Sequence, residues 1–543
     1  MKTRSSFGLI VIVSLLLSSC AAASPAPEAE RLNANNAPAE EAPFYDEEPA
    51  AEEAQPMEYE AVQATSVPLN NPSAAEESRP MPTQAATGDV VMDHGNEFQD
   101  FGLNEYENTR NDHLSTFALD VDTASYSMTR RYINEGNLPP AEAIRVEEFV
   151  NAFDAGYEAP RKSAFALYAD GAPSPFEDDG TYLIRFGVKG YEVPDYARKP
   201  LVLTFVIDVS GSMKMDNRLD LVKDSLELLV DQLDRFDSVA IVVYGSRSYT
   251  VLEPTRGDDY NTIMRAINKL KSGGSTNVED GLRIGYKEAM HAYDQDATNR
   301  VILCSDGVAN TGETAWNALL NDIHGYVDQG ITMTSMGFGM GNYNDVLMEQ
   351  LADNGNGNYY YIDTLDESKE LFVENLTSTL QVIAMDAKIQ IDFNPDVVSY
   401  YRLIGYENRD IADEDFRDNA VDAGEIGAGH SAVAIYAVHF DAYAEGRIAT
   451  MQMRWEDPDT HEVVEISGDL NTRDMLDRYE DANEYYQLAV TVMQFAEVLR
   501  ESPWGQETSL RMISNYAEDA ASTIRTEEVE EFAELVWQAA RIR

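Results

Sequence analysis

Three oxygen-bearing residues, Asp208, Ser210 and Ser212, follow directly on an apolar run at residues 201–207. A continuous run of β-prone apolar residues predicts a strand buried on both faces of a parallel sheet. The three side chains would then lie on the loop at its carboxyl end, where open α/β sheets place their ligand sites. Hard oxygen donors at alternate positions favour Mg²⁺ or Ca²⁺ over a soft metal. The sequence therefore predicts a cation site on this loop.

Two later segments complete the pattern. Gly273-Gly274-Ser275-Thr276-Asn277 precedes an amphipathic helical stretch, and residues 301–305 form a second apolar strand that leads to Asp306. The order Asp-x-Ser-x-Ser, then Thr276, then Asp306 resembles the metal-ion-dependent adhesion site of the von Willebrand factor type A domain. The competing interpretation is that Asp208 and Asp306 only cap the helices that follow them. It does not account for five matching positions in order, and we prefer the metal site.

The resemblance implies a role for each of the five positions. Ser210, Ser212 and Thr276 would supply hydroxyl ligands, whereas Asp208 and Asp306 would act directly or through bound water. The cofactor would be Mg²⁺, or Mn²⁺ or Ca²⁺, with one position left for an Asp or Glu carboxylate of a protein partner. The loops that would set specificity lie around Met213, 246–249, Asn310 and Gly341.

Residues 199–364 alternate between predicted strands and helices, which indicates a doubly wound, mostly parallel α/β sheet. The predicted strands span residues 201–207, 238–244, 300–304, 331–337 and 358–362. The predicted helices span residues 217–236, 260–270, 277–294, 314–329 and 343–353. This order is similar to that of the type A domain throughout.

The flanking regions have a different character. Residues 96–198 contain a strand running into a helix near 117–126, a helix at 138–151 and two antiparallel strands within 164–192. Residues 365–543 begin with a helix at 366–385. Alternating strands follow at 387–393, 398–403, 431–440 and 447–455, and two helices at 482–501 and 526–541 form a predicted hairpin. We expect the strands of 164–192 to complete an antiparallel β-sandwich with those of 387–455, so that the type A domain is inserted between them.

The N-terminus predicts export. Residues 1–20 combine Lys2 and Arg4 with a short apolar run and end on Leu17-Ser18-Ser19-Cys20, which resembles a bacterial lipobox with Cys20 as the lipidated residue. Secretion with ordinary cleavage nearby is the alternative. Residues 21–95 are rich in Ala, Pro and Glu, which predicts a disordered acidic tether. The flanking segments also resemble the N-terminal segment and C-terminal domain of unknown function of bacterial type A lipoproteins. A membrane-anchored protein on the outer face of the envelope follows, on the outer membrane if there are two.

Charge and isolated reactive residues limit the function classes. The net charge of −56 argues against binding to nucleic acid, because no basic face is available for phosphate. Cys304 is interpreted as a core residue and His430 as structural. Asp120 and Asp122 have the Asp-x-Asp spacing of haloacid-dehalogenase-type phosphatases, but Ala124 and the absence of later motifs disfavour an enzyme. We expect an envelope lipoprotein that binds a protein partner through a metal site. The alternative is an envelope scaffold or assembly factor with a purely structural metal.

Overall fold

A computed structural model describes residues 90–93, 96–119, 121–307, 319–320, 323–339 and 343–542. The predicted signal peptide, Cys20, residues 21–89 and Asp120 lie outside these ranges. The described chain begins with a hairpin in which β1 (Val90–Asp93) pairs antiparallel with β2 (Asn96–Gln99). Residues 90–93, which the prediction assigned to the disordered tether over 21–95, form a strand. Among the described residues, no helix combines the length and the apolar character needed to cross a membrane.

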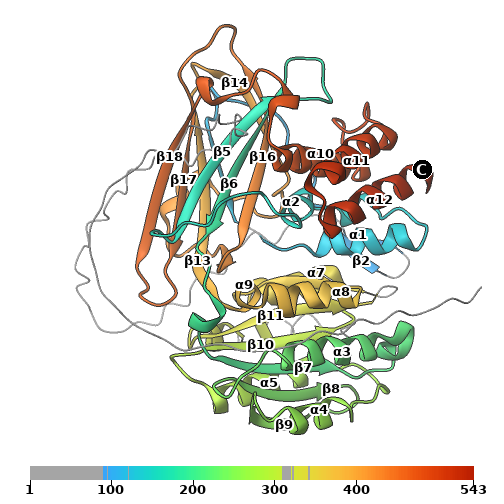
Figure 1. The fold of residues 1–543 in the computed structure, drawn as a ribbon. Helices are drawn as coiled ribbons and strands as arrows, with labels where there is room; N and C mark the ends of the chain where they lie inside the picture. The colour runs from blue at the N-terminus through green and yellow to red at the C-terminus, as the bar shows by residue number, and fades with distance from the viewer. Residues whose placement is uncertain are drawn as a thin grey trace, which may run out of the picture. The chain divides into compact units, whose positions relative to one another are not determined.

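The central α/β domain has a six-stranded sheet of order β12-β11-β10-β7-β8-β9, parallel except for the last pair (Figure 1). Its strands are β7 (Leu201–Asp208), β8 (Ser238–Tyr244), β9 (Tyr249–Arg256), β10 (Thr298–Ser305), β11 (Ile331–Phe338) and β12 (Tyr359–Ile362). The predicted doubly wound fold is confirmed. The edge strand β9 was missed because it is largely exposed and contains Pro254, both of which weaken a strand signal.

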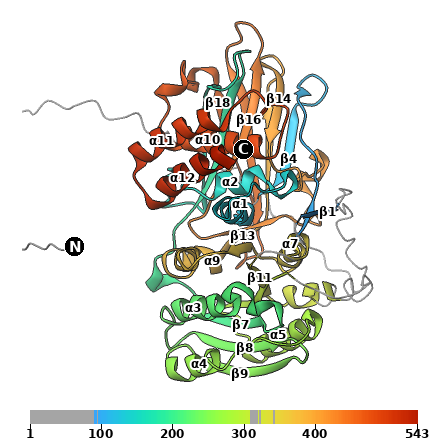
Figure 2. The same ribbon diagram turned by 90° about the vertical axis from the view of Figure 1, so that its right-hand side faces the viewer.

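Helices cover both faces of this sheet. They are α3 (Arg218–Val230), α4 (Tyr260–Ile267), α5 (Val278–Ala292) and α7 (Asp345–Asp353). Figure 2 shows α3 and α5 on opposite sides of the sheet, and separate apolar clusters fill the two faces. Side chains at three helix starts accept backbone N–H groups, as capping residues do: Asp259, Asn277 and Asn344.

The chain leaves the α/β domain through a broken helix. It consists of α8 (Leu365–Lys369), a π-helical turn η4 (Glu370–Glu374) and α9 (Leu376–Leu380). The predicted helix over 366–385 was too long, because β13 (Val382–Phe393) begins inside it and continues into the next domain.

The second domain is an antiparallel sandwich. One sheet has the order β15-β13-β17-β18 with β4 also paired to β13, and the other has the order β3-β14-β16-β6-β5. The strands are β3 (Glu107–Asn108), β4 (Leu114–Ala118), β5 (Phe165–Pro173), β6 (Tyr182–Gly190), β14 (Val398–Ile404), β15 (Gly424–Gly427), β16 (Ser431–Phe440), β17 (Arg447–Glu456) and β18 (Val463–Asn471). Because β6 pairs directly with β16, the predicted insertion of the α/β domain into the sandwich is confirmed.

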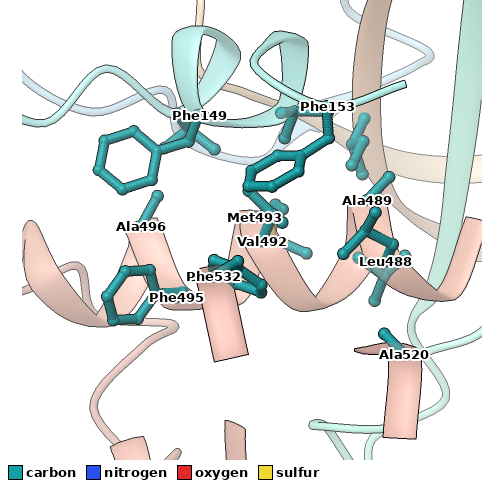
Figure 3. Packing of buried hydrophobic residues seen from close by; sticks show 14 of the residues in the cluster. Phe149, Phe153, Leu488, Ala489, Val492, Met493, Phe495, Ala496, Ala520 and Phe532 are labelled. Atoms are coloured by element: carbon teal, nitrogen blue, oxygen red, sulfur yellow. The ribbon is translucent and has the colours of Figure 1, made fainter. Parts of the chain in front are cut away.

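Three C-terminal helices cover one face of the sandwich: α10 (Glu484–Leu499), α11 (Leu510–Ile524) and α12 (Glu527–Ile542). The prediction had only α10 and α12. Half of the apolar stripe of α11 is alanine, Ala517 and Ala520 beside Leu510 and Ile513, which gives little contrast in the sequence. Figure 3 shows the shared core, in which Phe532 lies between Phe153 and Phe495.

The segment between β4 and β5 carries α1 (Ala124–Asn134) and α2 (Val146–Asn151). The predicted helix over 138–151 divides into the 3₁₀ turn η1 (Ala141–Ala143) and α2. Further 3₁₀ turns are η2 (Asp195–Ala197), η5 (Asp413–Arg417), η6 (Thr472–Asp474) and η7 (Tyr479–Asp481). Buried ion pairs join this segment to the α/β domain: Arg145, the residue before α2, pairs with Asp345 of α7 at 2.8 Å.

The π-helical turn carries a carboxyl group that predicts a pH dependence of stability. Burial, with Glu367 and Glu374 on the same segment and Glu528 of α12 nearby, raises the pKa of Glu370 to about 7 against the opposing charge of Arg130. A folded-state pKa above the unfolded value means that the group costs no stability below pH 4.5, where it is protonated in both states. The cost grows as the pH rises from 4.5 to about 7, and it is constant above that, where the group is ionised in both states.

Glu370→Gln removes that charge at nearly constant shape. We expect the variant to be more stable than the wild type at pH 8, by about 1–2 kcal/mol because the group is only half-buried, and equally stable at pH 4. Urea unfolding at the two pH values measures this. Glu445→Gln, at an exposed position outside this segment, serves as control, and an equal stabilisation of both variants at both pH values contradicts the prediction.

Candidate functional site

Two adjacent strand ends bring the predicted carboxylates together. β7 and β10 run parallel, with Ile207 opposite Cys304, so Asp208 and Asp306 follow at the same edge of the sheet. Both side chains are fully buried. The long apolar stretches of the two strands fix this position, because their side chains fill the cores on both faces of the sheet.

The first loop wraps tightly around Asp208. Its Oδ1 accepts the backbone N–H of Ser210 at 2.6 Å, and the hydroxyls of Ser210 and Ser212 lie 2.9 Å apart. A 3₁₀ turn, η3 (Ser212–Asn217), then leads into α3, with Met213 buried in the core below. The structure therefore groups three of the five predicted ligand residues on one short loop.

The second loop closes against the first. The backbone of Gly211 donates to the carbonyl of Gly274 at 3.0 Å, and Gly273 donates to the carbonyl of Val209 at 2.7 Å. Gly274 has φ +100°, and a Cβ there would lie 2.2 Å from Ser246 Oγ, so only glycine fits. These bonds place half-buried Thr276 on a loop beside Ser210 and Ser212.

The structure adds a charged residue that sequence reasoning missed. Arg218, the first residue of α3, is buried and places Nη1 3.0 Å from Asp306 Oδ2. The residue was read as part of an amphipathic helix, where arginine is normally exposed. Only its position at the start of α3, shortly after the Asp-x-Ser-x-Ser loop, could have indicated contact with the site.

The remaining carboxylate oxygens suit a cation. Asp208 Oδ2 and Asp306 Oδ1 are buried and accept no hydrogen bond. Burial, and then the charge of Asp306, raise the pKa of Asp208 to about 7. A divalent ion would relieve both the lost hydration and the repulsion, and the neighbouring hydroxyls are hard ligands. The described residues contain no group of three or more His, Cys, Asp or Glu side chains arranged to hold a metal. The site would therefore depend on two carboxylates and hydroxyls, and these residues fit the ion.

The rim of the site is open to solvent. Gly211, Lys214 and Arg247 are exposed, and so are the side chains of Met215 (45%) and Tyr249 (57%). Lys214 and Met215 follow the first loop, whereas Arg247 and Tyr249 follow Ser246, which accepts the backbone N–H of Ser275 at 3.0 Å. The predicted specificity residues Asn310 and Gly341 lie outside the described residues.

Three other residues singled out in the sequence lie in structural settings. His430 is half-buried, and burial followed by the charge of Lys189 lowers its pKa to about 4. Burial raises the pKa of the Cys304 thiol to about 12, as expected for a core cysteine. Asp122 accepts the backbone N–H of Tyr359 at 2.9 Å and lies 3.5 Å from Arg409, so it ties the N-terminal segment to β12.

Comparisons with known proteins agree with this architecture. The family model described as von Willebrand factor type A domain matches residues 203–374, and one described as von Willebrand factor matches residues 92–185. The model described as uncharacterized protein YfbK, C-terminal, matches residues 378–446 and 440–542.

Individual relatives cover different shares of the chain. Uncharacterized protein YfbK of Escherichia coli (strain K12) is 33% identical over 450 residues, which are 78% of this chain and 77% of that protein. Uncharacterized protein sll0103 of Synechocystis is 24% identical over 282 residues, 50% of this chain and 66% of that protein. Among solved structures, von Willebrand factor type A from Catenulispora acidiphila covers 69% of this chain and 91% of its own, with 13% identity and a TM-score of 0.41.

The extent of the match to YfbK, 33% identity over 78% of this chain and 77% of that protein, decides the assignment. The chain belongs to the YfbK family of proteins that carry a von Willebrand factor type A domain.

Proposed function

We propose that this chain binds a protein partner through a divalent cation held at the strand ends of its type A domain. The observation that carries the proposal is the pair of buried oxygens, Asp208 Oδ2 and Asp306 Oδ1, which accept no hydrogen bond. Two such oxygens at adjacent strand ends are costly unless a cation comes between them.

The residues that would hold the ion are Asp208, Ser210, Ser212, Thr276 and Asp306. Bound Mg²⁺, or Mn²⁺ or Ca²⁺, would supply a positive charge able to accept one more oxygen ligand. The two carboxylates are offset by the charge of Arg218, and the hydroxyls are neutral, so the chain neutralises only part of the ion's charge. An Asp or Glu carboxylate of the partner is therefore the ligand that this site favours.

The bracing of the loops supports a binding role over a purely structural metal. The two loops are already joined by backbone bonds from Gly211 to Gly274 and from Gly273 to Val209, and Asp306 is held by Arg218. Since these contacts need no ion, the cation is available for recognition. We propose a binding protein and not an enzyme.

The rim favours an acidic partner. Lys214 and Arg247 place exposed cations beside the site in a chain whose net charge is −56. Met215 and Tyr249 add apolar area next to them, as residues at the centre of protein interfaces do. The partner segment that suits this surface carries a carboxylate flanked by an apolar side chain.

Titration calorimetry of the purified chain with Mg²⁺, Mn²⁺ and Ca²⁺ tests the metal site. Saturable binding of at least one ion near one equivalent is the expected result. Heats indistinguishable from dilution for all three ions in the wild type would contradict the proposal.

The envelope location is a separate proposal that depends on Cys20. We propose that the chain is exported and lipid-anchored through this residue at the outer face of the envelope, with residues 21–89 between the anchor and the described part of the chain. Cys20→Ala is expected to move the protein from the membrane to the soluble fraction after cell fractionation. Cys304→Ala is the matched control, and membrane retention of Cys20→Ala would contradict the anchor.

A further inference from the structure

Arg218 is a buried cation inside the candidate metal site, and neither the family's site pattern nor the proposed function assigns it a role. We infer that Arg218 is a built-in counter-ion for the two aspartates, which keeps the domain stable without metal and limits how tightly the metal binds. The inference deepens the proposed function and, in its metal part, rests on it.

The geometry is that of a specific ion pair. Arg218 Nη1 lies 3.0 Å from Asp306 Oδ2, and the side chains are 3% and 0% exposed. The bond occupies Oδ2 and leaves Oδ1 without a hydrogen bond. A hydrogen-bond donor that fixes one oxygen of a carboxylate determines where the other oxygen can meet an ion. Arg218 thus orients Asp306 as well as compensating its charge.

The backbone is shaped to seat this guanidinium. Asp216 (φ 49°) and Asn217 (φ 57°) are consecutive left-handed residues, and they start α3 at Arg218. Gly339 has φ +94°, and a Cβ on it would lie 2.1 Å from Arg218 Nε. Two consecutive left-handed residues are uncommon outside glycine. The left-handed turn directs Arg218 into the site, and the absence of a side chain at Gly339 leaves room for its guanidinium.

The charges of Asp208, Asp306 and Arg218 predict how the arginine affects metal binding. With Asp208 and Asp306 ionised, the site carries two negative charges, and Arg218 reduces the net charge of the metal-free site to −1. A divalent ion would then bring the site to +1, whereas without Arg218 it would reach neutrality. The arginine therefore makes the empty site less costly to bury, weakens the attraction for the ion and leaves the loaded site positive toward a partner carboxylate.

Arg218→Gln tests the inference, because glutamine keeps a hydrogen-bond donor and loses the charge. In EDTA, the melting temperature is expected to fall by about 4 °C or more, since Asp306 loses its counter-charge. In titration calorimetry the affinity for Mg²⁺ is expected to rise by about 10-fold or more, because a cation beside the site is gone. Lys223→Gln, which removes a cation that lies on the same helix and pairs with exposed Asp220, is expected to change neither quantity.

Two further variants keep the test decisive. If the loss of stability arises from uncompensated charge, Arg218→Gln combined with Asp306→Asn recovers it in EDTA. Failure of the double variant to recover, an unchanged melting temperature of Arg218→Gln, or weaker Mg²⁺ binding by it overturns the inference. Arg218→Lys retains the charge and is expected to bind Mg²⁺ within about 3-fold of the wild type.

The outcomes separate this inference from the proposed function. Mg²⁺ binding by the wild type that is not tightened in Arg218→Gln overturns the counter-ion role and leaves the metal site standing. Binding by Arg218→Gln alone, with none by the wild type, supports the counter-ion role and contradicts the proposed metal-dependent function. No binding by either protein overturns both.

Discussion

Asp208→Ala is expected to abolish saturable Mg²⁺ binding and to leave the chain folded. Among the described residues, Asp208 and Asp306 supply the carboxylates at the site, and the one that the substitution leaves, on Asp306, is already paired with Arg218. Loss of a hydrogen bond that orients a ligand lowers metal affinity by about 10–100-fold, so loss of a ligand carboxylate itself should exceed about 100-fold. Folding should survive, because the deleted group is a buried carboxyl whose Oδ2 accepts no hydrogen bond.

Calorimetric titration with Mg²⁺ measures the loss of metal binding, and thermal unfolding in EDTA shows whether the variant is still folded. Asp220→Ala is the matched control, since Asp220 lies on α3 close to the site in sequence but is exposed and pairs with Lys223. It should bind Mg²⁺ as the wild type does. Retained binding in Asp208→Ala would place the ion elsewhere on the chain.

Arg145→Met is expected to produce a large loss of stability. Arg145 is buried and pairs with Glu148 of α2 and with Asp345 of α7 at 2.8 Å, and it lies 3.8 Å from Glu349. Removing it leaves buried negative charges without a counter-charge between the N-terminal segment and the type A domain. Removing one partner of a buried ion pair costs about 3–5 kcal/mol.

Equilibrium unfolding in urea measures this loss. Arg473→Met is the control, because Arg473 is 83% exposed and its pair with Asp474 should contribute less than about 1 kcal/mol. Adding Asp345→Asn to Arg145→Met should recover part of the lost stability, since it removes one of the buried negative charges that lack a counter-charge. Equal effects of Arg145→Met and Arg473→Met would show that the buried network contributes no more than a surface pair.

The elements with strong apolar patterns were predicted from the sequence, and those with weak patterns were not. Strands β7 and β8 are almost entirely apolar and lie where expected, and the pairing of β6 with β16 confirms the predicted insertion. β18 was missed because its buried side is interrupted by Gly468, which lies between Ile466 and Leu470 and carries no apolar side chain. The spacing of apolar residues in a sequence indicates which side chains are buried. Edge strands and half-exposed elements bury too few side chains to produce a clear spacing.

Some residues of the candidate site could likewise be predicted from the sequence, and others could not. Asp208 and Asp306 could be placed because each follows an apolar strand, and parallel neighbours bring their ends together. Their role as metal ligands stays a prediction. Arg218 could not be found, because its burial depends on Gly339 and on the left-handed turn before α3, neither of which has a residue pattern.

The insertion of the type A domain has a consequence for the order of folding. The strands β6 and β16 are neighbours in one sheet, yet the chain must make the whole type A domain between them. The two ends of that domain meet, since Lys199 donates its backbone N–H to Gln381 across 182 residues. Once folded, the domain becomes a short closed link, and the entropy of closing a long loop no longer opposes the sandwich. Until then β6 keeps an unpaired edge, so slow folding of the type A domain would expose the chain to aggregation through that edge.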